Sequence, residues 1–82
     1  MRRQRTSRPR VRLNPQAVWE HLGRRDMSQN ELARAAGITS GHISLLMNDR
    51  RSPSPGVRRR LQAALGVTDF DELFILEPYR ES

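Results

Sequence analysis

The chain has 82 residues, of which 35% are hydrophobic, so we expect one domain built around a single small core. It carries 15 Lys and Arg residues against 9 Asp and Glu residues, a formal net charge of +6, and every one of these cations is arginine. The absence of cysteine excludes disulfides and thiolate metal sites, and no run of about eighteen apolar residues is present to form a transmembrane helix. We therefore expect a soluble, cytoplasmic protein.

The charge is distributed unevenly along the chain. Residues 1–60 hold 14 of the arginines against four acids, whereas residues 61–82 hold Arg80 alone against five acids. A coding bias toward arginine explains the preference over lysine, but it does not explain this segregation. The pattern predicts a basic surface that meets a polyanion and an acidic end that points away from it.

The N-terminal segment has no means of forming a core. Residues 1–10 carry five arginines and no large apolar residue beyond Met1, so we expect a disordered arm. The alternation of Arg10, Val11, Arg12 and Leu13 that follows is typical of a short strand.

The first helix is expected to begin at Asn14-Pro15, with the asparagine as N-cap and the proline in the first helical position. It is expected to end near residues 23–25. Its apolar residues recur at the spacing of a single helical face, which consists of Pro15, Val18, Trp19 and Leu22. His21 falls outside this pattern, so we expect it on the surface.

Two shorter helices are predicted between residues 28 and 47. Ser28 with Glu31 three residues later forms a capping box, and Gly37 supplies the positive φ that ends this helix. Thr39 or Ser40 caps the next one. The side chains expected to face the core are Leu32, Ala33, Ala36, Ile43, Leu46 and Met47.

After a loop over residues 48–53, a fourth helix is predicted from Ser54-Pro55 to the Gly66 turn, and a short fifth helix from Thr68. The residues expected to be buried here are Val57, Leu61, Ala64, Leu65, Phe70, Leu73 and Phe74. The segment that follows, up to Tyr79, is expected to be extended. The predicted fold is an all-α, compact bundle of about five short helices over residues 11–76, with the arm before it, a tail over residues 77–82 and room for short terminal strands.

The stretch S-Q-N-E-L-A-R-A-A-G-I-T-S-G-H-I-S-L-L-M-N, residues 28–48, has the layout of a helix-turn-helix. A tight turn needs small residues where the helices touch, and Ala33 and Gly37 supply them. This stretch closely resembles the Cro and phage-repressor type helix-turn-helix family, also called the xenobiotic-response-element family. The resemblance continues through R-R-L-Q-A-A-L-G-V and D-E-L-F, so it covers about residues 14–75. It implies a bacterial or phage protein, associated with the nucleoid, that binds operator DNA as a dimer and regulates transcription.

The resemblance also implies which residues meet DNA. The base-reading positions of the family fall on Ser40, Gly41, His42 and Leu45. The residues expected at phosphates are Gln29, Ser44, Asn48, Arg50 and Arg51. Direct readout should be weak, because a serine hydroxyl is unselective, glycine has no side chain and leucine offers only an apolar contact to a thymine methyl. His42 bonds a base, bonds a phosphate or faces solvent.

Arginines outside the motif are expected to add affinity. The N-terminal arm carries Arg2, Arg3, Arg5, Arg8 and Arg10, and it either enters a minor groove or attracts DNA without regard to sequence. Arg58, Arg59 and Arg60, at the start of the fourth helix, either contact phosphates or form a solvated face.

Catalysis and bound cofactors are not expected. The sequence contains no nucleophile with a paired base and no glycine-rich phosphate loop, and the two histidines make no metal constellation. Asp69, Asp71 and Glu72 are better explained as acids at a helix start than as metal ligands.

The expected partners are double-stranded DNA and a second copy of the chain. The dimer surface is predicted at Phe74, Ile75 and Leu76 with Tyr79, and the alternative is that these residues only close the core of the monomer. Val11 and Leu13 are expected to pair with this segment as a strand, within one chain or between two. The leading hypothesis is a transcriptional repressor. The alternatives are an antitoxin or adaptor whose C-terminal end binds a protein, and a basic protein that binds nucleic acid without sequence preference.

Overall fold

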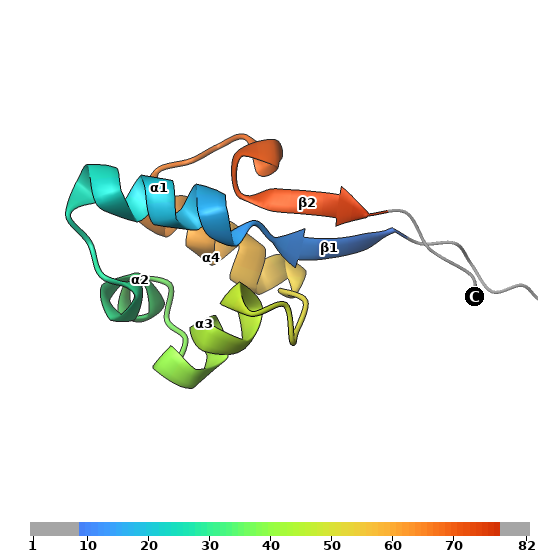
Figure 1. Cartoon of the computed structure of the whole chain (residues 1–82), viewed down its shortest axis with the longest axis horizontal. Coiled ribbons are helices and arrows are strands. Elements are labelled where there is room, and N and C mark those ends of the chain that lie inside the picture. The colour runs from blue at the N-terminus through green and yellow to red at the C-terminus, as the bar shows by residue number, and fades with distance from the viewer. Residues whose placement is uncertain (1–8, 78–82) are drawn as a thin grey trace, which may run out of the picture.

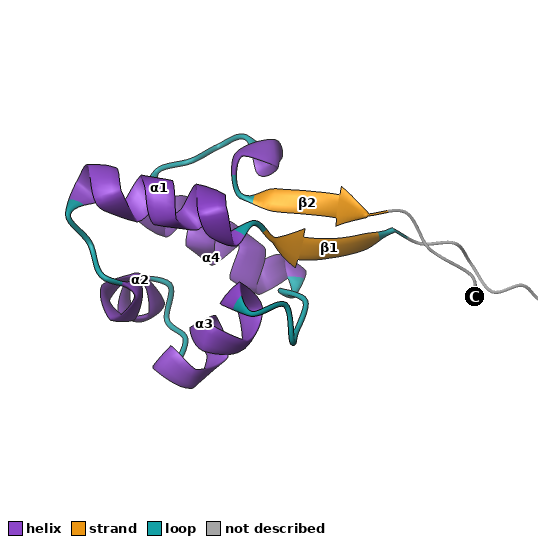
Figure 2. Ribbon diagram, viewed as in Figure 1, coloured by secondary structure: helices purple, strands orange, loops and turns teal. Residues whose placement is uncertain are grey.

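The computed structural model describes residues 9–77, which form four α-helices, one 3-10 turn and a two-stranded sheet (Figure 1). In chain order the elements are β1 (Arg10–Leu13), α1 (Pro15–Arg25), α2 (Gln29–Ala35), α3 (Ser40–Met47), α4 (Pro55–Leu65), the 3-10 turn η1 (Phe70–Glu72) and β2 (Phe74–Glu77). Most of the described residues are helical, as Figure 2 shows, and this confirms the predicted class. Tyr79 and most of the predicted arm, residues 1–8, lie outside the described residues. None of the described helices has the length and apolar character needed to cross a membrane.

Each α-helix begins at a residue whose side chain accepts a hydrogen bond from a first-turn backbone N–H. These caps are Asn14, Ser28, Thr39 and Ser54. Such a cap satisfies one of the four N–H groups that a helix start leaves without a partner, and it contributes about 1 kcal/mol. The local signals read from the sequence therefore predicted the helix starts correctly, with Thr39 rather than Ser40 as the cap of α3.

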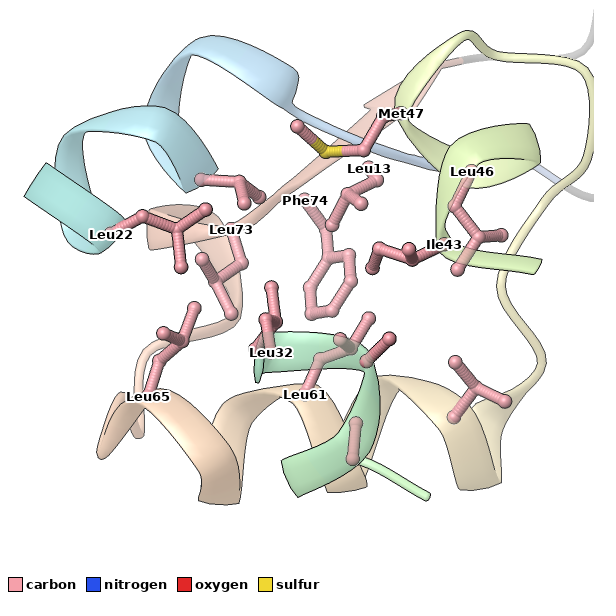
Figure 3. Packing of buried hydrophobic residues seen from close by; sticks show 14 of the residues in the cluster. Leu13, Leu22, Leu32, Ile43, Leu46, Met47, Leu61, Leu65, Leu73 and Phe74 are labelled. Carbon is pink, nitrogen blue, oxygen red and sulfur yellow. The ribbon is translucent and has the colours of Figure 1, made fainter. Parts of the chain in front are cut away.

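The core lies between α1, α2, α3 and α4 and is closed by the sheet (Figure 3). Every element except η1 contributes at least one buried apolar side chain, and Leu32, Ile43, Leu46 and Leu73 are 0% exposed. Each such side chain contributes about 1.5–3 kcal/mol by leaving water. The stripes predicted for the two motif helices are confirmed, because all six of their side chains are buried.

The two strands pair antiparallel within the chain, with Leu13 opposite Phe74 and Val11 opposite Leu76. Phe74 is only 2% exposed, and its ring lies 5.1 Å from that of Phe70. Phe74 therefore belongs to the core, and the prediction that it forms part of a dimer surface is wrong. Leu76, by contrast, is 55% exposed.

The buried face of α1 differs from the predicted one. Trp19 is 53% exposed, whereas His21, expected on the surface, is 8% exposed. The imidazole is acceptable in the core because its polar atoms have partners. Arg25 Nη1 donates to His21 Nδ1 at 3.1 Å, and His21 Nε2 lies 3.5 Å from Glu72 Oε1. Arg25 also donates to the carbonyl of Leu65, so these contacts join the end of α1 to α4 and η1.

The predicted fifth helix is a single 3-10 turn, η1, and its cap is Asp69 rather than Thr68. Asp69 Oδ1 accepts from the backbone N–H of Asp71 at 3.1 Å. A longer helix is prevented because Phe74 and the residues after it pair with β1 instead. Apolar spacing alone did not distinguish these outcomes, since a short apolar run is compatible with either structure.

Candidate nucleic-acid interface

The turn between α2 and α3 has the geometry of a helix-turn-helix. Gly37 has a φ of +71°, and its N–H donates to the carbonyl of Arg34 at 3.1 Å. The next residue, Ile38, donates to the carbonyl of Ala33 at 2.9 Å. A positive φ is accessible to glycine without steric cost, so the turn stays tight. Ala33 and Ala36 are buried where α2 packs in the bundle, as the small residues of the motif require.

One side of α3 is fixed in the core while the other faces solvent. Ile43 and Leu46 are 0% exposed and hold the helix against the bundle. On the opposite side Ser40, Gly41 and Leu45 are exposed, and His42 is half-buried. The four predicted base-reading residues therefore all reach the surface of α3. None of the residues of α3 is an aspartate, glutamate, lysine or arginine.

The beginning of α2 is held firmly beside this surface. In the capping box, the backbone N–H of Ser28 donates to Glu31 Oε1 at 2.7 Å, and that of Glu31 donates to Ser28 Oγ at 3.0 Å. The hydrogen bond from the Ser28 backbone is the main cause that lowers the pKa of Glu31 below its ordinary value. Gln29, the predicted phosphate contact, is the half-buried residue that opens α2 within this box.

The end of α3 is also defined by side-chain bonds. Asn48 Nδ2 donates to the carbonyl of Ser44 at 2.8 Å and lies 3.4 Å from its hydroxyl. These two predicted phosphate contacts are therefore brought together, while Arg50 and Arg51 extend from the loop as exposed residues. Asp49, which lies between Asn48 and Arg50, adopts a φ of +57°.

The arginines expected to approach DNA differ in their exposure and in their contacts within the domain. Arg10 belongs to β1, and its guanidinium is 2.6 Å from Asp49 and 3.2 Å from Glu77. Its hydrogen bond to Asp49 is the main cause that raises its pKa. Arg10 thus begins the folded domain instead of belonging to the arm. Arg59 and Arg60 are exposed, whereas Arg58 is half-buried and its Nε has no hydrogen-bond partner among the described residues.

Two exposed polar residues near the interface were missed by sequence reasoning. Asn30 and Arg34 lie one turn apart on α2 and line a hollow of about 300 Å³ at the start of α3, together with Ser40. Their spacing of four residues marks one face of a helix, but only the packing of α2 against α3 shows that this face adjoins the predicted reading surface.

Within residues 9–77, no group of three His, Asp or Glu side chains is placed to hold a metal ion. The polar side chains of the helix-turn-helix surface are instead distributed along α2, α3 and the loop that follows. This is an arrangement suited to hydrogen bonding along an extended partner.

Comparison with known proteins agrees with this geometry. The helix-turn-helix family model matches residues 22–73, more than half of the chain. An uncharacterized HTH-type transcriptional regulator of Methanothermobacter thermautotrophicus is 35% identical over 60 residues, which cover 73% of this chain and 87% of that protein. The crystal structure of the transcriptional regulator VanUg shares the fold, with a TM-score of 0.69 at 22% identity over 93% of this chain and 99% of that one. The chain belongs to the helix-turn-helix family of DNA-binding transcriptional regulators of the Cro and phage-repressor type.

Proposed function

We propose that the protein is a sequence-specific transcriptional repressor that places α3 in the major groove of operator DNA. The observation that carries this proposal is the two-sided burial of α3. Ile43 and Leu46 are 0% exposed, while Ser40, Gly41 and Leu45 on the other side face solvent. A helix held in this way is supported by the core and free to enter a groove about 12 Å wide. Repression follows from occupancy, since a protein seated in the groove blocks other proteins from the same site.

In this proposal, affinity and specificity come from different residues. Phosphates are met by Gln29 at the start of α2 and by Asn48, Arg50 and Arg51 at the end of α3. These contacts fix the position of the protein on the duplex without reading its sequence. Specificity comes from α3, where Leu45 is the largest exposed apolar side chain, 40% exposed, and is suited to contact a thymine methyl group.

We further propose that the protein acts as a dimer in which Leu76 and Ile75 contribute to the interface. Leu76 is 55% exposed on β2, and Ile75 beside it is half-buried. A single domain of this size reads one half-site, and two copies related by a twofold axis would read a pseudo-palindrome with half-sites about 34 Å apart.

The experiment that tests this function is selection of bound sequences from a random DNA pool by the full chain. We expect an enriched pseudo-palindrome whose half-sites repeat after about 10 base pairs. With the selected operator, Leu45→Ala should reduce the preference over unrelated DNA and leave the salt dependence unchanged. Arg51→Ala should weaken binding to all sequences and lower the slope of log K against log salt by about 0.9. Absence of any enriched sequence would refute specific recognition, and a slope near zero would refute DNA binding.

A further inference from the structure

One charged side chain of the helix-turn-helix has no ionic partner among the described residues. Residues 28–48 contain a single acid, Glu31, and a single arginine, Arg34. The carboxylate of Glu31 is engaged in the capping box, where it accepts from the backbone N–H of Ser28 at 2.7 Å. Arg34 is exposed on α2 and makes no ion pair within residues 9–77. Its guanidinium is therefore available to a partner outside the domain.

Arg34 lies beside the start of the reading helix. α2 packs against α3, and Figure 1 shows the two helices next to each other. The hollow of about 300 Å³ between them has three polar lining residues, Asn30, Arg34 and Ser40, and two apolar ones, Ala33 and Ile38. This open space adjoins both the arginine and the first residue of α3. The fold therefore leaves room for the long side chain of Arg34 to extend alongside Ser40.

The first turn of α3 presents only small groups to solvent, because Ser40 carries a short hydroxyl and Gly41 has no side chain. Small groups allow this turn to approach the base edges closely in the proposed complex. Since α2 packs against α3, the same approach brings Arg34 toward the duplex. A serine hydroxyl bonds donors and acceptors alike and distinguishes the bases poorly. The base edges beside Ser40 are therefore left to a longer side chain from a neighbouring element.

We propose that Arg34 is a specificity-determining residue, which reads a guanine in the major groove next to the bases that face Ser40. This proposal rests on the proposed DNA-binding function and extends it. Guanine presents two acceptors in the major groove, O6 and N7, and a guanidinium matches them with two N–H donors in a planar fork. α2 thus supplies the directed base contact for which α3 itself carries no arginine.

A phosphate is the other partner open to an exposed arginine, and the position of Arg34 favours a base. Gln29, a proposed phosphate contact, opens α2, whereas Arg34 lies in the last turn of this helix. That turn leads into α3, and there Arg34 shares the lining of the hollow with Ser40. The cations proposed at phosphates, Arg50 and Arg51, extend from the loop at the other end of α3. Arg34 therefore adjoins the start of the reading surface and not the loop that faces phosphates.

The test compares the sequences selected from a random DNA pool by the full natural chain, by Arg34→Ala and by Arg51→Ala. Arg51→Ala is the matched control, because it removes the same charge from a residue proposed to contact a phosphate. Alanine is the best helix former and Arg34 is exposed, so Arg34→Ala should remain folded, and thermal melting verifies this. The guanine identified by selection is then replaced with 7-deazaguanine, which pairs normally but lacks the N7 acceptor.

We expect the natural chain to prefer guanine at one position of each half-site and Arg34→Ala to lose this preference alone. The ratio between guanine and the other bases at this position should fall about five- to tenfold. This is the lower part of the range for a bidentate contact, because an exposed side chain must be ordered on binding. 7-Deazaguanine should weaken binding of the natural chain and leave that of Arg34→Ala unchanged. The slope of log K against log salt should stay the same for Arg34→Ala and fall by about 0.9 for Arg51→Ala.

The reading role is overturned if Arg34→Ala selects the same sequences as the natural chain, or if 7-deazaguanine affects the two proteins equally. It is also overturned if Arg34→Ala weakens binding to all sequences alike and lowers the salt slope by about 0.9, because Arg34 then contacts a phosphate. In each of these cases the natural chain still enriches an operator, so the proposed function stands. If the natural chain enriches no sequence, the proposed function fails and the reading role fails with it. The two failures are therefore distinguishable in one set of selections.

Discussion

Gly41, the second residue of the reading helix, is the position at which stability and DNA binding are expected to oppose each other. A Cβ added to Gly41 would meet no atom closer than Thr39 Oγ1, at 3.9 Å, so the fold leaves ordinary space for a methyl group. Its φ does not lie in the positive range that would require glycine. Nothing in the folded domain therefore demands glycine here, and a glycine in a helix is entropically unfavourable.

Replacing Gly41 with alanine should stabilise the protein. A compatible Gly→Ala change contributes about 0.4–1 kcal/mol, mainly by restricting the unfolded chain. Gly41 lies in the first turn of α3, so we expect the lower part of this range, which corresponds to a rise of roughly 2–4 °C in Tm for a domain of this size. Gly56 is the matched control, because it is the second residue of α4 and a Cβ added there also meets nothing within 4 Å.

The same methyl group should weaken operator binding if the backbone of α3 approaches the base edges closely at Gly41. Forcing an extra methylene-sized group into a packed contact costs about 1–3 kcal/mol, which is roughly fivefold to more than a hundredfold in Kd. Fluorescence anisotropy with the selected operator measures this loss, and Gly23→Ala on α1 supplies the baseline for a site away from α3. If Gly41→Ala is more stable and binds with unchanged affinity and sequence preference, the reasoning about close approach is refuted.

The remaining predictions concern the core, the cap and the sheet. Leu22→Ala should cost about 2–5 kcal/mol in chemical unfolding. Trp19→Ala should cost clearly less, because Trp19 is 53% exposed and its removal leaves no enclosed cavity, and equal losses would contradict the burial of α1. The pKa of Glu31 is lowered in the folded protein, so its charged carboxylate stabilises the fold at pH values above its ordinary pKa of 4.5. This stabilisation is lost as the pH falls through the folded-state pKa. Glu31→Gln should therefore lose less stability than the natural chain between pH 7 and pH 3, and an identical loss would count against this cap. Leu76→Glu should leave the monomer folded and shift sedimentation toward the monomer; an unchanged dimer would exclude Leu76 from the interface.

The elements that the sequence predicted well are those specified by neighbouring residues. Ser54-Pro55 starts α4 and Gly66, with a φ of +68°, ends it, because a cap and a turn need only a few adjacent residues to form. The same holds for the buried side of α3, since the motif specifies that Ile43, Leu46 and Met47 face the core. Local chemistry was sufficient for these features.

The features that were mispredicted depend on residues distant in the chain. His21 is buried because Glu72, 51 positions later, comes within 3.5 Å of its ring, and no periodicity within α1 contains that information. For Phe74 the apolar spacing predicts a helix and the expected pairing with Val11 and Leu13 predicts a strand, and only the strand pairing, with Leu13 opposite Phe74 in the same chain, is present. The contact between Arg10 and Asp49 spans 39 positions and was missed for the same reason.

The absence of charge on α3 has a consequence for how the protein finds its site. In the proposed mode of binding, the arginines outside α3 attract any duplex, and this attraction does not depend on sequence. On a wrong DNA sequence, a helix with charged side chains would leave one of them without its partner base, at a cost in free energy. A helix of small and apolar residues pays no such cost, so it discriminates only weakly against wrong sequences. Each half-site can then supply only the modest discrimination of contacts such as the one proposed for Leu45. The binding free energies of two half-sites add, so a dimer would double the free-energy difference between operator and unrelated DNA. The ratio of the two binding constants would then be squared. Weak readout by one α3 is thus the strongest physical argument for the dimer proposed above.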